Sequence, residues 1–363
     1  MAGLYIHIPF CHSKCIYCDF YSMPQTDRMA AFLHALPREY ERRKQEINEP
    51  FKTLYIGGGT PSIVEPAKLA GLCQSFPVSD IEEFTIEVNP EDVTPDRIKA
   101  WKEIGVNRIS MGIQSFSDVE LREIRRRHTA DDATKAIEQL LEGGIENISC
   151  DLIYGLPGQT IESWKLSLSR LLSFKLPHLS AYCLSYEPGT ALYARMTAGK
   201  VQPTDDDTLA AMYALLCSET AAAGYEHYEI SNFAVPGMRS QHNSSYWTAT
   251  PYLGLGPGAH SFDGHTRRYN PGNLKEYLAS GSITVIDEET DDESFNDKII
   301  TALRTSDGLN LSELKPEQAQ YITEAVKPFV ASGEILVTDR SRIRISEPAW
   351  FHSDTILREL IVV

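Results

Sequence analysis

The chain has 363 residues, of which 42% are hydrophobic and 23% are charged, so it can form a large globular domain and a smaller one. Its formal net charge of -16 argues against nonspecific binding to nucleic acid or anionic lipid, because both are negatively charged. The first residues lack a basic region before an apolar core, and no apolar run reaches the roughly eighteen residues of a membrane helix. We therefore expect a cytoplasmic protein with no nucleic-acid partner and no membrane span.

Three of the seven cysteines lie close together, as Cys11, Cys15 and Cys18 in a C-x3-C-x2-C pattern. A fully ligated [4Fe–4S] cluster takes four thiolates, so three closely spaced ones would leave one iron open. Zinc would need a Cys/His set that closes a tetrahedron, and His12 lies too close to its flanking cysteines to be an obvious fourth ligand. The pattern favours a cluster whose open iron binds S-adenosylmethionine (SAM), with zinc or unligated thiols as alternatives. The scattered cysteines are interpreted as small core residues: Cys73, Cys150, Cys183 and Cys217.

Short β-rich runs alternate with amphipathic stretches along the first part of the chain. This alternation predicts repeated βα units around a parallel sheet. The predicted strands are 4–8, 53–56, 84–88, 108–113, 147–154 and 179–185. The predicted helices are 28–47, 67–74, 95–104, 119–125, 130–142, 161–173 and 205–223.

The first five predicted strands each lead into a distinctive motif. Since the carboxyl ends of parallel barrel strands meet at one mouth, we expect these motifs to converge. Glycines at 57–59 would let the backbone approach a ligand, and Thr60 adds a hydroxyl. Glu87 and Asp151 could accept hydrogen bonds from ribose hydroxyls or an ammonium group, and Gln114 could both donate and accept.

Two further residues are weaker candidates for this mouth. Arg126 could neutralise a carboxylate, although a run of three arginines at 125–127 is typical of a solvated helix face. Tyr17, inside the cysteine loop, could stack on adenine, although an aromatic residue there more often serves packing.

The strand–helix alternation ends near residue 230. Loops rich in glycine, proline and aromatic residues follow, and then an acidic run at 287–293 that predicts a solvated linker or a helix start. We expect a barrel at 1–230, an extension closing its mouth at 231–286, and a small helical domain at 287–363. Within the last segment we expect helices near 296–303, 311–314 and 316–332, and strands near 335–338 and 342–345.

The order of these motifs resembles the radical SAM proteins of the oxygen-independent coproporphyrinogen III oxidase group. The resemblance spans residues 4–262 and includes Tyr5–Cys11, Gly57–Pro61, Glu87–Pro90, Gln114–Phe116 and Asp151–Pro157. It implies a partial (β/α)6 radical-SAM barrel with a small C-terminal helical domain carrying a β-wing. By resemblance, Cys11, Cys15 and Cys18 ligate the cluster. The cofactor site would be lined by Tyr5, Tyr17, Gly58, Gly59, Thr60, Glu87, Gln114, Arg126, Asp151, Cys183 and His260, the last two through their backbone.

Within this group the chain is most similar to the haem chaperones, through Cys18-Asp19-Phe20 and His242-Asn243-x-x-Tyr246-Trp247. The oxidases carry an extra cysteine two positions after the third ligand, where this chain has Phe20. The resemblance therefore implies a carrier that binds haem and transfers it to recipient proteins, using the cluster, SAM and a reductant such as flavodoxin or ferredoxin. The alternatives are an oxidase that decarboxylates coproporphyrinogen III in porphyrin biosynthesis, and radical chemistry on another substrate.

His242 is the candidate haem ligand, because an imidazole nitrogen is the commonest axial donor and neighbouring aromatic residues could pack on a porphyrin. The alternative is that the His-Asn-x-x-Tyr-Trp motif ties down a loop by hydrogen bonds.

Overall fold

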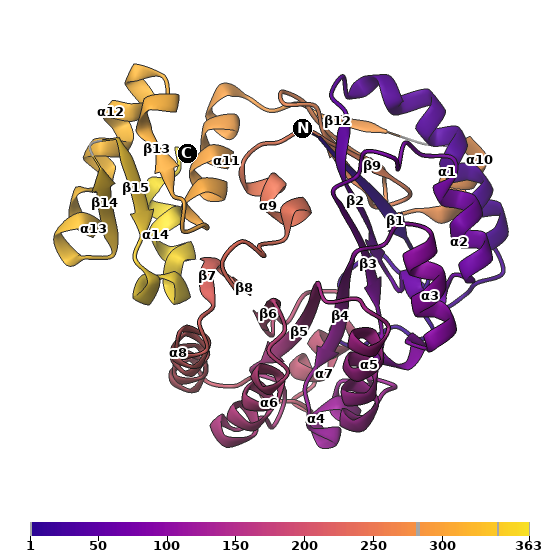
Figure 1. Ribbon diagram of the computed structural model, residues 1–363. Helices are drawn as coiled ribbons and strands as arrows, with labels where there is room; N and C mark the ends of the chain where they lie inside the picture. The colour runs from indigo at the N-terminus through magenta and orange to yellow at the C-terminus, as the bar shows by residue number, and fades with distance from the viewer. Residues whose placement is uncertain (1, 281–283, 340, 363) are drawn as a thin grey trace.

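The computed structural model describes residues 2–280, 284–339 and 341–362. Within them, twelve strands form one large sheet and three form a small one (Figure 1). No helix in these described ranges combines the length and apolar character needed to cross a membrane. Residues 281–283, in the expected extension, lie outside the described residues, and the boundaries of the three expected segments remain a prediction.

Six parallel strands, in chain order, form the centre of the large sheet and confirm the predicted βα architecture. Helices cover the outer side of this curved sheet (Figure 1). The parallel strands are β1 (Ala2–Ile8), β2 (Phe51–Gly58), β3 (Glu83–Val88), β4 (Arg108–Gln114), β5 (Ile148–Tyr154) and β6 (His178–Cys183). The helices of this region are α1 (Met29–Arg43), α2 (Pro66–Cys73), α3 (Pro95–Glu103), α4 (Asp118–Glu123), α5 (Ala130–Glu142), α6 (Ile161–Ser173), α7 (Ala191–Thr197) and α8 (Asp206–Ala222). The sequence analysis missed α7.

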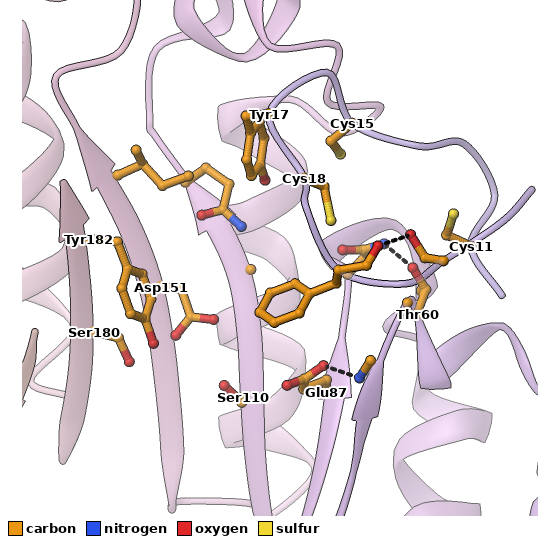
Figure 2. A pocket seen from close by; sticks show the side chains of 18 of the residues that line it. Cys11, Cys15, Tyr17, Cys18, Thr60, Glu87, Ser110, Asp151, Ser180 and Tyr182 are labelled. Atoms are coloured by element: carbon orange, nitrogen blue, oxygen red, sulfur yellow. Dashed lines mark hydrogen bonds between the residues drawn. The ribbon is translucent and has the colours of Figure 1, made fainter. Parts of the chain in front are cut away.

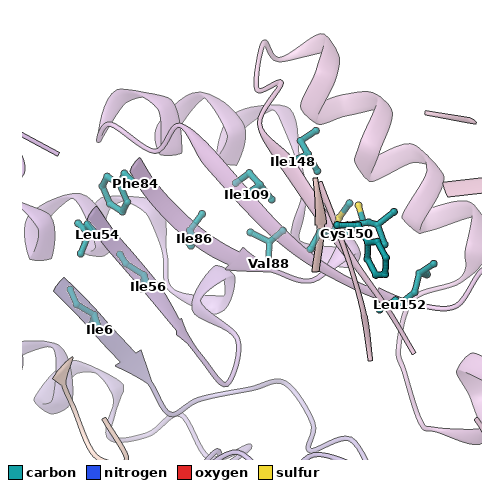
Figure 3. Packing of buried hydrophobic residues seen from close by; sticks show 14 of the residues in the cluster. Ile6, Leu54, Ile56, Phe84, Ile86, Val88, Ile109, Ile148, Cys150 and Leu152 are labelled. Atoms are coloured by element: carbon teal, nitrogen blue, oxygen red, sulfur yellow. The ribbon is translucent and has the colours of Figure 1, made fainter. Parts of the chain in front are cut away.

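The strands have an apolar face and a polar face, because successive side chains point to opposite sides. Leu54, Ile86 and Ile109 are fully buried on the face that packs against the helices (Figure 3). Burying one such side chain stabilises the fold by about 1.5–3 kcal/mol. The alternate residues on these strands are polar, so the inner face offers hydrogen-bonding groups to a ligand.

Residues 226–287 add six short strands that the sequence analysis did not predict. They are β7 (Glu226–Glu229), β8 (Asn232–Ala234), β9 (Tyr252–Leu255), β10 (His260–Phe262), β11 (Arg267–Tyr269) and β12 (Val285–Asp287). Strand β9 pairs in parallel with β1, and β8 pairs antiparallel with β6. Because β12 and β7 lie at opposite ends of the strand order, the sheet stays open and the barrel is partial.

A buried carboxylate attaches this added part to the barrel. Glu39 on α1 is fully buried and accepts hydrogen bonds from Arg43 Nη1 at 2.7 Å and the Gly256 amide at 2.9 Å. The Asn270 amide and the Tyr277 hydroxyl also donate to it, each at 2.6 Å. Since a buried charge is costly unless it is paired and hydrogen-bonded, this network holds the segment in one position.

The C-terminal region contains a small helical domain with a three-stranded sheet. The acidic run begins a helix, as one of the two interpretations predicted: Thr290 Oγ1 accepts a hydrogen bond from the Glu293 amide in a capping box. Strands β14 and β15 confirm the predicted wing, and the two-residue β13 was missed. The elements are α11 (Asp291–Leu303), β13 (Leu309–Asn310), α12 (Pro316–Ala325), α13 (Lys327–Ser332), β14 (Ile335–Asp339), β15 (Arg342–Ile345), the 3-10 helix η5 (Glu347–His352) and α14 (Ser353–Leu360).

Candidate functional site

A cavity of about 590 Å³ is lined by the inner faces and carboxyl ends of β2 to β6 and by the cysteine loop (Figure 2). Alternate residues of single strands line it, such as Arg108, Ser110 and Gly112 on β4, because only every second side chain points inward. The predicted site residues that line it are Cys11, Cys15, Tyr17, Cys18, Gly58, Gly59, Thr60, Glu87, Gln114, Arg126, Asp151 and Cys183.

The three cysteines of the motif lie on one loop beside this cavity (Figure 2). The Cys11 amide donates to the Met23 carbonyl at 3.0 Å, and the Cys18 amide donates to the Cys15 carbonyl at 3.3 Å. His12 instead points to Asp92, with Nε2 3.0 Å from Oδ1. The loop therefore presents thiols to the cavity while its histidine is engaged elsewhere.

The glycine run forms a turn against the start of the cysteine loop. Gly58 has a φ of +113°, a conformation that residues with a Cβ rarely adopt. A Cβ on Gly59 would lie 2.5 Å from the Phe10 carbonyl oxygen, and the Thr60 amide donates to that oxygen at 2.7 Å. The glycines thus allow two backbone segments to approach closely at the edge of the cavity.

Glu87 lies at the carboxyl end of β3 with both carboxylate oxygens hydrogen-bonded. Oε1 accepts from the Tyr55 hydroxyl at 2.8 Å, and Oε2 accepts from the Gly58 amide at 2.9 Å. Withdrawal from solvent raises the pKa of Glu87 to about 7, against the opposing effect of these hydrogen bonds. Glu87 can therefore titrate near neutral pH and accept further bonds when ionised.

Asp151 and Arg108 present unsatisfied polar atoms in the cavity. Asp151 Oδ1 is shielded from solvent without a hydrogen-bond partner among the described residues, as are Arg108 Nε and Nη1. Removal from solvent raises the pKa of Asp151 to about 6, although a hydrogen bond from Ser180 and the charge of Arg108 lower it. Buried polar atoms are rarely left unpaired, so a polar ligand fits this space.

Arg126 turns into the cavity, whereas Arg125 and Arg127 are exposed. Its guanidinium donates to Asn89 Oδ1 at 2.7 Å and lies 3.7 Å from Cys15 Sγ. The solvated-face interpretation is therefore wrong for Arg126, because a left-handed residue at Arg125 (φ +58°) ends the helical run.

The cavity also includes residues that the sequence analysis missed. Asn89, which accepts from Arg126, follows directly after Glu87-Val88 in a motif that was recognised, but no role was assigned to it. Arg108 could have been found from the sequence, because it is a charged residue in an apolar strand and lies two positions before Ser110.

Of three further residues that the resemblance placed in the cofactor site, Cys183 lines the cavity, whereas Tyr5 and His260 do not. Cys183 is exposed and lines the cavity, so its interpretation as a core residue is wrong, whereas Cys73 and Cys150 are buried as predicted. Within the described chain, Tyr5 and His260 are not among the cavity-lining residues. The Tyr5 hydroxyl lies 3.0 Å from His7 Nδ1, and the His260 ring stacks on Tyr269.

His242 lies on a helix, α9 (Gln241–Trp247), rather than on a loop, and its side chain is fully buried. Its Nδ1 is 2.7 Å from Thr53 Oγ1, and its Nε2 is 2.9 Å from the Tyr246 hydroxyl. Burial lowers the pKa of His242 to about 3, so the ring is neutral. A haem iron would have to displace one of these bonds, so the geometry favours the hydrogen-bonding alternative for the motif.

Replacing His242 with alanine should lower the free energy of unfolding by about 2–4 kcal/mol, because the Thr53 and Tyr246 hydroxyls lose their partner and a cavity forms. Denaturant titration would measure this loss. Tyr246→Phe removes one hydrogen bond and should lower the free energy of unfolding by a smaller amount. A changed haem absorption spectrum in a folded His242→Ala protein would contradict the structural role.

The site fits a [4Fe–4S] cluster with bound SAM. The cysteine loop supplies thiols and the glycine turn allows close backbone approach. Asp151 Oδ1 and Arg108 Nη1 have no hydrogen-bond partner among the described residues. Separate carboxylates on β3 and β5 could hold hydroxyl and ammonium groups.

Comparison with known proteins agrees with this geometry. Residues 5–171 match the Radical SAM superfamily. Heme chaperone HemW of Bacillus subtilis is 38% identical over 85% of this chain and 85% of its own length. Heme chaperone HemW of Lactococcus lactis is 33% identical over 99% of this chain and 97% of its own. The structure of coproporphyrinogen III oxidase HemN from Escherichia coli aligns over 99% of this chain and 90% of its own with a TM-score of 0.85, but at 23% identity it shows the fold alone.

Proposed function

Because the chain belongs to the heme chaperone HemW family of radical SAM proteins, we propose that it binds haem and transfers it to recipient proteins. The radical SAM family implies a [4Fe–4S] cluster and SAM as cofactors. Electron transfer to SAM is the chemistry that a bound cluster supplies, with a reductant such as flavodoxin or ferredoxin as the proposed electron source.

The chain's own residues would bind and orient these groups. Cys11, Cys15 and Cys18 would hold the cluster, and Arg126 lies beside Cys15 where it can offset thiolate charge. Glu87 and Asp151 would accept hydrogen bonds from the hydroxyl or ammonium groups of SAM.

Phe20 is the observation that favours a carrier over an oxidase. Its side chain is 69% exposed and lines the cavity, at the position where the resembling oxidases carry their extra cysteine. An exposed aromatic ring beside a cavity can stack on or pack against a flat apolar ligand such as a porphyrin. It cannot supply the thiol chemistry of a cysteine.

The test is anaerobic incubation of reconstituted protein with haem in one experiment and with coproporphyrinogen III, SAM and reductant in another. We expect stoichiometric haem uptake, passage of that haem to an apo-haemoprotein, and no protoporphyrinogen IX. Phe20→Ala should weaken haem binding about 2- to 10-fold, the range expected for one aromatic contact. Leu166→Ala, a change at a 72% exposed residue on α6, is the matched control. Robust formation of protoporphyrinogen IX would overturn the proposal.

A further inference from the structure

A second group of metal-binding side chains lies at the junction between the barrel and the C-terminal domain. It consists of Cys217 on α8, His227 on β7 and Glu347 on η5. One donor atom from each lies within 4.8 Å of the other two. None of the three lines the cavity described above, so the group is separate from the cysteine loop.

Two of the three donor separations in this group are close to those around a tetrahedral zinc ion. Cys217 Sγ lies 3.8 Å from His227 Nδ1, and that nitrogen lies 3.2 Å from Glu347 Oε1. Bonds of about 2.3 Å to sulfur and 2.0–2.1 Å to nitrogen and oxygen give ligand separations of about 3.6 Å and 3.3 Å in a tetrahedron. A cation would fit between these atoms with little movement of the backbone.

The histidine is already oriented for ligation. His227 Nε2 lies 3.2 Å from the Ile230 carbonyl oxygen, which can only accept, so Nε2 carries the proton. In the neutral ring, this leaves the Nδ1 lone pair facing the thiol and the carboxylate. A backbone carbonyl that accepts from the second ring nitrogen is one of the common ways in which proteins orient a histidine ligand.

Packing fixes the same ring. The His227 side chain is only 5% exposed. Its ring stacks on Phe233 at a centroid distance of 4.1 Å, and the Trp350 ring contacts it edge-on at 4.3 Å. The Glu347 side chain is 54% exposed, so water can reach the position opposite the protein ligands.

We propose that Cys217, His227 and Glu347 bind a zinc ion, with water as the fourth ligand. Binding would release the thiol proton of Cys217 and involve no change of oxidation state. The ion would link the last barrel helix and the edge strand β7 to the C-terminal domain. The competing explanation is an ion pair between a protonated His227 and Glu347, which needs neither Cys217 nor a metal.

The first test measures zinc content in cluster-loaded full-length protein after incubation with Zn²⁺ and desalting. We expect one zinc per chain in the wild type and in Cys73→Ala, whose thiol is buried elsewhere. Cys217→Ala and Glu347→Gln should lose this zinc with unchanged iron content. Equal zinc content in all four proteins would overturn the proposal.

The second test separates metal binding from a fault in folding. In a Cys11→Ala, Cys15→Ala, Cys18→Ala background, which removes the other group of thiols, Co²⁺ should produce a thiolate-to-cobalt charge-transfer band that Cys217→Ala abolishes. Zn²⁺ should raise the Tm of this background but not that of its Glu347→Gln derivative, because a ligand stabilises only the form that binds it. Equal Tm shifts, or a cobalt band without Cys217, would contradict zinc ligation here.

Discussion

Alanine in place of Cys11, Cys15 or Cys18 should abolish the visible absorbance of the anaerobically reconstituted cluster, together with its bound iron and sulfide. The protein supplies three thiols from one loop, so removing one leaves only two on that loop to hold the cluster. Iron and sulfide analysis of each variant, alongside its absorption spectrum, would measure the effect.

Cys73→Ala and Cys150→Ala are the matched controls for this experiment. Both residues are buried in the hydrophobic core rather than beside the cavity, so their variants should retain a full complement of iron. An equal loss of cluster in these controls would show that the three loop cysteines are not the ligand set.

Glu87→Gln and Asp151→Asn should each weaken SAM binding roughly 10- to 100-fold while leaving iron content unchanged. A hydrogen bond to a charged group contributes about 1.5–3 kcal/mol, and each amide keeps the shape of the side chain but loses its charge. Equilibrium binding of SAM to the reconstituted protein would measure the loss. Glu103→Gln, at an exposed position on α3, is the control, and unchanged affinity in both site variants would rule out this cavity as the SAM site.

The same carboxylates predict that SAM affinity rises with pH. With the pKa of Glu87 raised to about 7, roughly a tenth of it is ionised at pH 6 and about nine-tenths at pH 8. Because the ionised form accepts hydrogen bonds from the ligand more strongly, affinity should rise up to about tenfold over this range. Glu87→Gln should flatten most of this rise, and an identical pH profile in the variant would assign the dependence to another group.

The parallel core and the cavity mouth were predictable because their signals are local. Each motif directly follows an apolar strand, so the position of Glu87 or Asp151 at a strand end can be found from neighbouring residues alone. The strands of residues 226–287 were not predictable in this way, because runs of three or four residues show too little periodicity and are fixed by their partners.

His242 illustrates what local sequence cannot reveal. Its spacing to Tyr246 indicates one helical turn, but its hydrogen bond to Thr53 joins residues 189 positions apart. Burial of the ring follows from that distant contact, and so does its reduced availability to a metal. Likewise, the sequence does not indicate that Cys217 and His227 are neighbours of Glu347, because only the fold brings the three together.

The open sheet also leaves two edges at which strands of other chains could pair. Unlike a closed barrel, it ends in two edge strands, and exposed edges can pair with other chains. At one end, Glu229 of β7 forms an antiparallel bridge with Thr305 of the C-terminal domain. At the other end, β12 is three residues long and finishes at Asp287, ahead of two glutamates. Short, charged or covered edges oppose strand addition, so the barrel can stay open for a wide ligand without offering a long template for aggregation.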